Sequence, residues 1–199
     1  MTSPQIKWSI DPSHSEIAFK VRHLMISHVK GQFKSFDASI YSTSNDFTTA
    51  DIDLWIDVTS INTGVEKRDL HLISNDFFDV ENHKQITFRS STIGEVDKHG
   101  NHVLWGELTM KGITRNIKLD VEFGGIIKDP WGNERAGFTA TGKINRNDFG
   151  LTWNTALETG GIMVGDEVSV ICEIQVINAG TTSLTMELEE AANEKALVL

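Results

Sequence analysis

The chain contains 199 residues, 39% of them hydrophobic and 23% charged, so it is long enough to form one soluble domain with a sizeable core. Its net charge of −10 and the absence of any basic block exclude a general nucleic-acid-binding surface and disfavour electrostatic docking on an anionic membrane. The single cysteine, Cys172, lies in an apolar run and cannot form an internal disulfide, so we expect a buried free thiol.

The N-terminal residues lack the apolar segment of a secretory signal. No stretch of the sequence is apolar for long enough to give a transmembrane segment in the form of a helix. Together these two observations predict a cytoplasmic location.

Alternation of apolar and polar residues runs through most of the chain, which is typical of strands with one buried face. Turn-forming residues separate the alternating segments and indicate an antiparallel meander. Because few helices are available to cover the apolar faces, the sheet must close on itself or face a second sheet. We expect strands over residues 7–10, 15–23, 29–41, 51–60, 85–96, 102–109, 115–127, 136–145 and 167–177.

Within the third strand the apolar positions change parity. Phe33 is at an odd position, whereas Phe36 and Ile40 are at even positions. A β-bulge near Ser35 would bend the strand and return both sets of side chains to the same face, as the corner of a barrel requires.

Two helices are predicted. Thr63 and Glu66 have the spacing of a capping box, with Thr63 as N-cap of a helix over residues 65–75. That helix would place Leu70 and Ile73 on one face and close one end of a barrel. Residues 181–199 are rich in helix formers and are expected to form an amphipathic helix that packs on the barrel or on a second subunit.

Signals for catalysis are weak. His14, His23 and His28 fall in a short window, but strand alternation places His23 and His28 on opposite faces. The sequence contains neither the HExxH nor the GxSxG pattern and no glycine-rich phosphate loop, and the other histidines, including His102, lie in or near predicted turns. We therefore expect no metal, no cofactor and no catalytic residue.

Several short motifs occur that alternation alone does not require. They are DPSHS at Asp11–Ser15, VRHLM at Val21–Met25, VKGQF at Val29–Phe33, the FFDV-containing segment 60–89, GELTMKGITRNIKL at 106–119, NRNDFGL at 145–151 and GDEVSVI at 165–171. In this order, over residues 8–177, they resemble the YceI-like family, whose members are lipocalin-like barrels that bind long isoprenoid or other lipid chains.

The resemblance implies an all-β fold: a single antiparallel eight-stranded, lipocalin-like barrel with a short capping helix and a helical C-terminal extension. It assigns residues 1–178 to a YceI-like lipid-binding barrel and residues 179–199 to the extension. An eight-stranded barrel is the size at which the interior can hold one small ligand. Family members often form dimers, so a homodimer is expected as well.

The function implied is non-catalytic binding of a polyisoprenoid, an isoprenoid quinone or another long-chain lipid, for carriage, storage or sequestration. The expected wall and lid residues are Phe19, Val21, Leu24, Met25, Phe33, Phe36, Leu54, Ile56, Leu70, Phe77, Phe78, Phe88, Leu108, Phe123 and Phe138. The candidates for contact with a polar head group are Asp11, His14, Arg22 and Arg89.

Two other functions stay open at this point. One is an enzyme of isoprenoid or quinone metabolism that uses His14, His23 and Arg22. The other is an interaction module with a solid core, because inward-facing aromatic residues fit a filled barrel as well as a hollow one.

Overall fold

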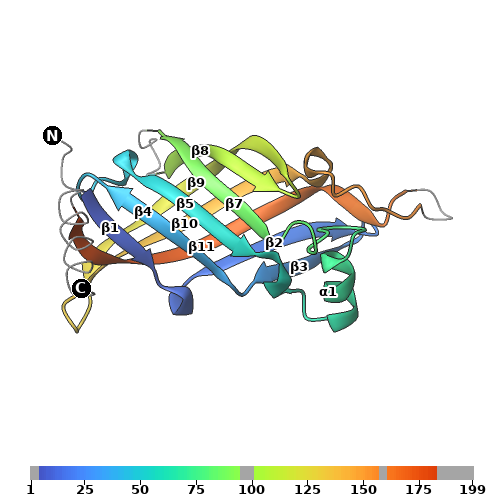
Figure 1. The fold of residues 1–199 in the computed structure, drawn as a ribbon, viewed down its shortest axis with the longest axis horizontal. Helices are drawn as coiled ribbons and strands as arrows, with labels where there is room; N and C mark the ends of the chain where they lie inside the picture. Colours follow the sequence, from blue (N-terminus) through green and yellow to red (C-terminus); the bar gives the residue numbers. More distant parts are fainter. Residues whose placement is uncertain (1–4, 95–100, 157–160, 183–199) are drawn as a thin grey trace, which may run out of the picture.

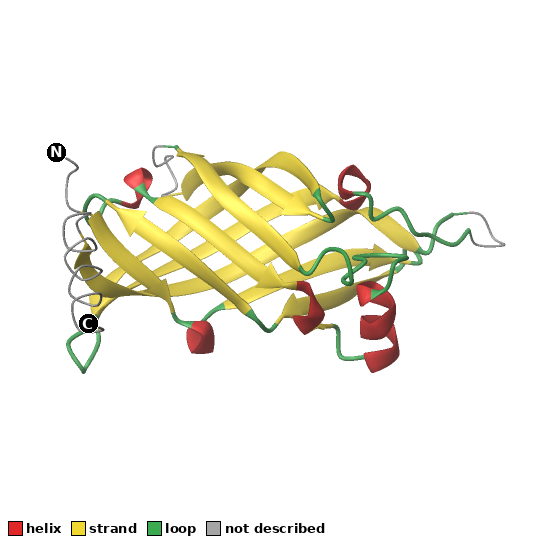
Figure 2. Cartoon of the chain, viewed as in Figure 1, coloured by secondary structure: helices red, strands yellow, loops and turns green. Residues whose placement is uncertain are grey.

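The computed structural model describes residues 5–94, 101–156 and 161–182. Strands form the walls, and the helical segments lie outside them (Figure 2). The first six strands are β1 (Gln5–Ile10), β2 (Glu16–His23), β3 (Ser27–Phe33), β4 (Phe36–Ser42), β5 (Asp51–Asp57) and β6 (Ile61–Asn62). They are followed by α1 (Glu66–Ile73), β7 (Gln85–Ile93), β8 (Asn101–Met110), β9 (Ile113–Lys128), β10 (Glu134–Asn145) and β11 (Val164–Thr182). Single 3-10 turns are η1 (Pro12–His14), η2 (Phe47–Thr49), η3 (Val58–Ser60) and η4 (Arg146–Phe149).

The strands close into an antiparallel barrel (Figure 1). Three of its strands are interrupted, so that β1 with β2, β3 with β4, and β5 with β6 each act as one long strand. The order around the barrel then follows the chain, and the long strand β11 closes the sheet by pairing with β10 on one side and with β1 and β2 on the other. The result is the predicted eight-stranded meander.

The predicted parity change near Ser35 takes the form of a break between β3 and β4. Lys34 and Ser35 leave the ladder, and Phe33 and Phe36 are both buried on either side of them. The hydroxyl of Ser60 accepts hydrogen bonds from the backbone N–H groups of Lys34 (3.1 Å) and Ser35 (3.0 Å), so a side chain replaces the missing strand partner at this corner.

A second corner separates β1 from β2 at Asp11. The Asp11 carboxylate accepts hydrogen bonds from the hydroxyl of Ser13 (2.6 Å) and from the guanidinium of Arg135 (2.7 Å), which also binds Asp129 (2.7 Å). The bond from Ser13 makes the largest contribution, burial opposes it, and further bonds from His14 and Arg135 help to hold the pKa of Asp11 well below its usual value. The DPSHS motif is thus a structural corner that residues far along the chain complete.

A similar carboxylate lies in the turn between β9 and β10. Burial would raise the pKa of Asp129, but hydrogen bonds from Arg135, Asn133 and Trp131 together lower it well below its usual value.

The predicted capping box is wrong in detail. α1 begins at Glu66 with Val65 as its N-cap, and no side chain caps that end. Thr63 instead donates its N–H to the carboxylate of Asp69 (2.9 Å) and accepts a bond from the Nε of Arg68 (2.7 Å) at its hydroxyl. The threonine therefore ties the loop to side chains of the first turn of the helix rather than to the free backbone N–H groups of that turn.

The predicted helical extension over residues 179–199 lies outside the described residues, except that β11 itself runs to Thr182. Within the described residues, no helix is both long and apolar enough to cross a membrane.

Candidate functional site

Inside the barrel, the described residues enclose two adjoining cavities of about 130 Å³ and about 180 Å³. We call them the first and the second chamber. Five residues line both, namely Ile17, Leu54, Phe88, Leu119 and Cys172. Together the chambers approach the lower end of the roughly 300–1,000 Å³ that small-molecule sites occupy.

The two chambers lie end to end along the strands. On β8, His102 and Leu104 line the first chamber, whereas Leu108 and Met110 line the second. The same order holds on β5, where Ile52 lines the first chamber and Ile56 lines the second. Because a strand rises about 3.3 Å per residue, the lining from His102 to Met110 extends over roughly 26 Å along β8. A site of this shape fits a chain-like ligand better than a compact one.

Glycines in the inner wall make room for aromatic rings that would otherwise fill the barrel. The ring of Phe19 lies across Gly31, its cross-strand partner, so that a Cβ at Gly31 would be 2.4 Å from the Phe19 Cζ. In the same way, the ring of Phe88 lies across Gly106, where a Cβ would be 2.3 Å from the Phe88 Cζ. Both phenylalanines therefore lie against the wall while still lining the second chamber.

An aromatic cluster closes the far end of the first chamber. Phe47 of η2 packs edge to face on Phe138, with ring centroids 4.7 Å apart, and lies 4.9 Å from the ring of Trp8. The fully buried Trp8 donates its Nε1–H to the hydroxyl of Ser42 (2.9 Å), which fixes the indole. Phe123 stacks on Phe138 in the same cluster.

The opposite end, beside the second chamber, is closed by α1 and the two loops that follow η4 and α1. His71 of α1 packs on Trp153 and on Phe77, with centroid distances of 4.8 Å and 5.1 Å. Leu72 of α1 lines the second chamber together with Phe77 and Phe78. The helix thus covers the cavity through Leu72.

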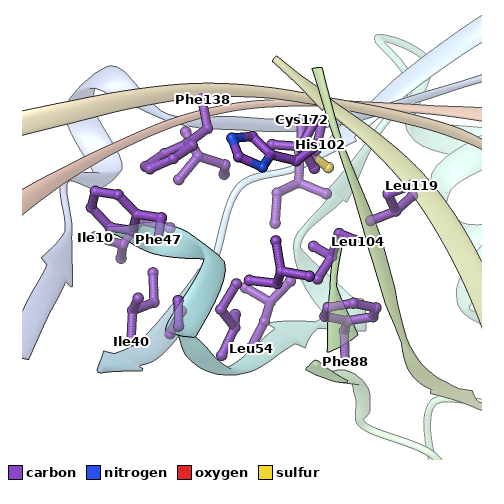
Figure 3. Close-up of a pocket in the computed structure, with 18 residues that line it drawn as sticks. Ile10, Ile40, Phe47, Leu54, Phe88, His102, Leu104, Leu119, Phe138 and Cys172 are labelled. Carbon is purple, nitrogen blue, oxygen red and sulfur yellow. The ribbon is translucent and has the colours of Figure 1, made fainter. Parts of the chain in front are cut away.

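His102 is the one polar ring among the first-chamber residues described, and Figure 3 shows it among apolar side chains. Its Nδ1 lies 3.1 Å from the carbonyl oxygen of Gly94. Since a carbonyl can only accept, Nδ1 carries the proton in this bond, and Nε2 is then free to accept a hydrogen bond when the ring is neutral. Strand β8 places His102 two residues before Leu104 and therefore on the same inner face, although the sequence had indicated only that it lies in or near a turn.

Arg146 is the charged residue of the second chamber, but its guanidinium is fully used by the protein. The side chain is 4% exposed, and all five of its N–H groups have partners. The acceptors are the carbonyls of Gly165, Leu151, Trp153 and Val164 and the carboxylate of Asp166. Burial lowers the pKa of Arg146, and the charge of Asp166 opposes that effect. The NRNDFGL motif therefore contains a structural anchor between η4 and β11.

Cys172 lies between the two chambers on β11, where its cross-strand partners are Ala140 and Ile17. Burial, with a smaller effect from the charge of Glu173, raises the pKa of the Cys172 thiol to about 12. The thiol is therefore free, buried and protonated, as expected from its apolar surroundings.

The structure places most of the expected wall residues on the chambers. Those that line one or both are Phe19, Val21, Phe33, Leu54, Ile56, Phe77, Phe78, Phe88, Leu108 and Phe138. Phe36 is buried in the wall, Phe123 lies in the closing cluster, and Leu24, Met25 and Leu70 lie outside both chambers.

None of the four head-group candidates lines a chamber. Asp11 belongs to the outer corner described above, and the His14 side chain beside it is 63% exposed. Arg22 donates to the carbonyl of Met25 (2.9 Å), and Arg89 pairs with Asp53 (3.0 Å) on the outer surface.

The residues of the enzyme hypothesis are not brought together. His14 precedes β2, whereas Arg22 and His23 stand at its far end. Among the described residues, no group of three His, Cys, Asp or Glu side chains is arranged to hold a metal ion.

Comparison with known proteins agrees with this geometry. The profile of the YceI-like domain matches residues 8–176. A UPF0312 protein of Staphylococcus epidermidis is 45% identical over 163 residues, covering 81% of this chain and 92% of the relative. The crystal structure of a Campylobacter jejuni YceI protein is 32% identical with a TM-score of 0.69, covering 80% of this chain and 90% of the other. A polyisoprenoid binding domain from Saccharophagus degradans is 16% identical with a TM-score of 0.60, covering 86% of this chain and 98% of the other, and shares the fold.

Proposed function

Because this chain belongs to the YceI-like family, we propose that its barrel binds a long apolar lipid in its interior and catalyses no reaction. The two apolar chambers that lie end to end inside the barrel carry this proposal. The lipid is a polyisoprenoid, an isoprenoid quinone or a similar long chain, and residues 1–178 bind it for carriage, storage or sequestration. A cytoplasmic location and a homodimer belong to the same proposal.

The physical chemistry of the chambers supports an apolar chain. Each CH₂ group that leaves water contributes about 0.8 kcal/mol, and this contribution does not depend on direction. A wall of aliphatic and aromatic side chains therefore needs no specific contacts to retain a long hydrocarbon. The name of the Saccharophagus degradans domain points to the same ligand class for that protein, although its likeness to this chain is one of fold.

The polar end of the ligand is assigned to the first chamber. All five N–H groups of Arg146 already donate to acceptors within the protein, so Arg146 cannot bind a head group. The Nε2 of His102, in contrast, can accept a hydrogen bond from a hydroxyl group. We therefore place a hydroxyl-bearing head group near His102 and the hydrocarbon tail in the second chamber. Two of the head-group candidates named from the sequence form ion pairs in the barrel wall instead: Asp11 pairs with Arg135, and Arg89 pairs with Asp53.

Retention of an added lipid tests the proposal. The protein is incubated with an isoprenoid quinone, passed through a gel-filtration column, and the quinone in the protein peak is measured by its absorbance. Leu54→Trp fills the junction of the two chambers and should abolish retention, whereas Trp55→Leu alters the outward-facing neighbour on the same strand and should not. Ala140→Leu is a milder filling variant of the first chamber. No retention by the unmodified protein, or equal retention by the filled variants, would contradict interior binding.

A further inference from the structure

The hairpin of β2 and β3 differs in charge from the rest of the molecule. From Ile17 to Phe36 the sequence contains no Asp or Glu, whereas the whole chain contains 28 of them. The same stretch contains Lys20, Arg22, Lys30 and Lys34. A protein with a net charge of −10 therefore presents one hairpin in which Glu16, at the start of β2, is the single acidic residue and every formal charge from Ile17 onward is positive.

Two positive side chains of this hairpin face each other across the strands, and a third faces a histidine. Lys20 is the cross-strand partner of Lys30, and Arg22 is the partner of His28. Like charges at directly opposite positions of a sheet are destabilising. In the part of the chain that the structure describes, none of these four side chains forms an ion pair, whereas Lys143 on β10 pairs with Glu167 of the neighbouring strand. This arrangement of unpaired positive charges lowers the stability of the free protein. Such a cost is expected of a surface whose charges are neutralised by an anionic partner.

The tip of the hairpin is apolar and strained. Leu24 and Met25 both have left-handed backbone, with φ of 49° and 61°. This is the geometry of a tight hairpin turn, for which Asn and Gly are the usual residues. Met25 is 47% exposed and Ile26 is 85% exposed, so the tip presents large apolar side chains to the outside.

The tip is also held in place. Arg22 donates from Nη1 to the carbonyl of Met25 (2.9 Å), and the N–H of Leu24 binds the carbonyl of Met163 (2.8 Å). An exposed apolar turn that the fold fixes in a strained conformation indicates a contact made outside the chain.

This tip lies at the end of the barrel next to α1 (Figure 1), where the second chamber is closed. Val21 lines that chamber from the same strand that carries Arg22 on its outer face. On α1, Leu70 is also exposed, at 59%. Two acidic side chains at this end are already engaged, since Asp69 accepts from Thr63 and Asp166 from Arg146.

We propose that the tip of the β2–β3 hairpin, Leu24 to Ile26, inserts into the interface of an anionic lipid bilayer, with Arg22, His28, Lys20 and Lys30 against the phosphates. Arg22 and His28 stand about 7–10 Å behind the tip at 3.3 Å per residue, which matches the roughly 5–10 Å depth of an interfacial apolar contact. Exposed charges that lie more than about 8–10 Å from this surface are largely screened at physiological ionic strength, which limits how strongly negative charges elsewhere on the molecule oppose the attraction. Docking places the α1 end of the barrel, and thus the second chamber, toward the membrane. This membrane docking is a property beyond the binding of a lipid in the interior, and it can be tested without any interior ligand.

Vesicle flotation with the full chain tests this surface. Vesicles of phosphatidylcholine alone and of phosphatidylcholine with phosphatidylglycerol are compared at low and at high salt. The protein should float with the anionic vesicles at low salt, and the paired change Lys20→Gln with Lys30→Gln should weaken binding by roughly tenfold or more. Met25→Ser with Ile26→Ser should weaken it as well. Ile127→Ser with Trp131→Ser, which removes exposed apolar side chains from the β9–β10 turn, should leave it unchanged.

Absence of flotation with anionic vesicles would overturn the proposal, and so would equal flotation with neutral vesicles. A loss of binding in the Ile127 and Trp131 control that equals the loss in the tip variant would also overturn it. All three variant pairs lie outside both chambers, so they should retain quinone in gel filtration. Failure of docking and failure of interior binding are therefore separate results.

Discussion

Phe19 on β2 and Gly31 on β3 are cross-strand partners, and the aromatic ring occupies the space that any side chain at Gly31 would need. The glycine of the VKGQF motif therefore has a packing role: it lets the Phe19 ring lie against the wall and leaves the second chamber open. The ring of Phe88 covers Gly106 in a similar way, although the cross-strand partner of Gly106 is Ser90.

Gly31→Ala should turn the Phe19 ring into the second chamber. The added Cβ would lie 2.4 Å from the ring and 2.8 Å from a methyl group of Thr63, so the protein should lose about 1–3 kcal/mol of stability through overpacking. Retention of isoprenoid quinone in gel filtration should fall at the same time. Gly137→Ala is the matched control, because a Cβ there meets nothing within 4 Å. Unchanged retention in Gly31→Ala would show that the ring does not border the ligand.

Cys172 should be almost inert toward iodoacetamide in the native protein. A thiol with a pKa of about 12 has a thiolate fraction at pH 8 that is roughly 10³-fold smaller than that of an ordinary thiol with a pKa of about 8.5. Alkylation followed by mass spectrometry should show slow labelling of the folded chain and fast labelling in denaturant. Rapid labelling of the folded protein would contradict the burial of this side chain.

Arg146→Met should destabilise the fold strongly. The substitution removes the donor of the carbonyls of Gly165, Leu151 and Trp153 and of the Asp166 carboxylate, whereas the Val164 carbonyl keeps its bond from Asn154. Loss of one partner from a buried charged cluster costs about 3–5 kcal/mol. Urea unfolding measures the change. Arg89→Met is the control, since its pair with Asp53 is exposed on both sides and contributes about 1 kcal/mol or less. Similar losses in the two variants would show that Arg146 does not anchor β11.

Stability should fall in acid partly because of Asp11. Its pKa in the folded state is lowered from the usual value of about 3.9, so the unfolded chain binds more protons than the folded one as the pH falls below about 5. The contribution of Asp11 is complete at neutral pH and is lost progressively from about pH 5 downward.

Asp11→Asn should therefore be less stable than the original at neutral pH and should show a flatter decline between about pH 5 and pH 2. Thermal unfolding at a series of pH values measures the slope. Asp53→Asn, at an exposed position, should keep the slope of the original. An unchanged slope in Asp11→Asn would contradict the role of this carboxylate.

Alternation was sufficient to predict most of the strands from the sequence, whereas their closure into one eight-stranded barrel was implied by the family resemblance. It identified inward positions such as Phe19 and Leu54, because the alternation of side chains along a strand is local. It placed the corner near Ser35 through the change of parity. The expected strand 102–109 already contained His102, two residues before Leu104, but the residue was grouped with the histidines near turns and its inward position was not recognised.

Features that depend on distant residues could not be predicted in this way. Asp11 was a head-group candidate, yet its main cation, Arg135, is 124 residues away in sequence. Leu24, Met25 and Leu70 were expected near the lid, but the positions of this turn and of this helix face, which leave Met25 and Leu70 exposed, are set by tertiary packing. The closure of the first chamber by Phe47 was missed because it lies on a single 3-10 turn with no periodic pattern.

The contents of the barrel are the most direct test of the central claim. The protein purified from cells is extracted with organic solvent, and the extract is compared by mass spectrometry with an extract of Leu54→Trp prepared in the same way. We expect a long-chain isoprenoid or quinone lipid from the unmodified protein and a clear depletion of it from the variant. An extract without such a lipid, together with no uptake of added quinone by the purified protein, would contradict the account.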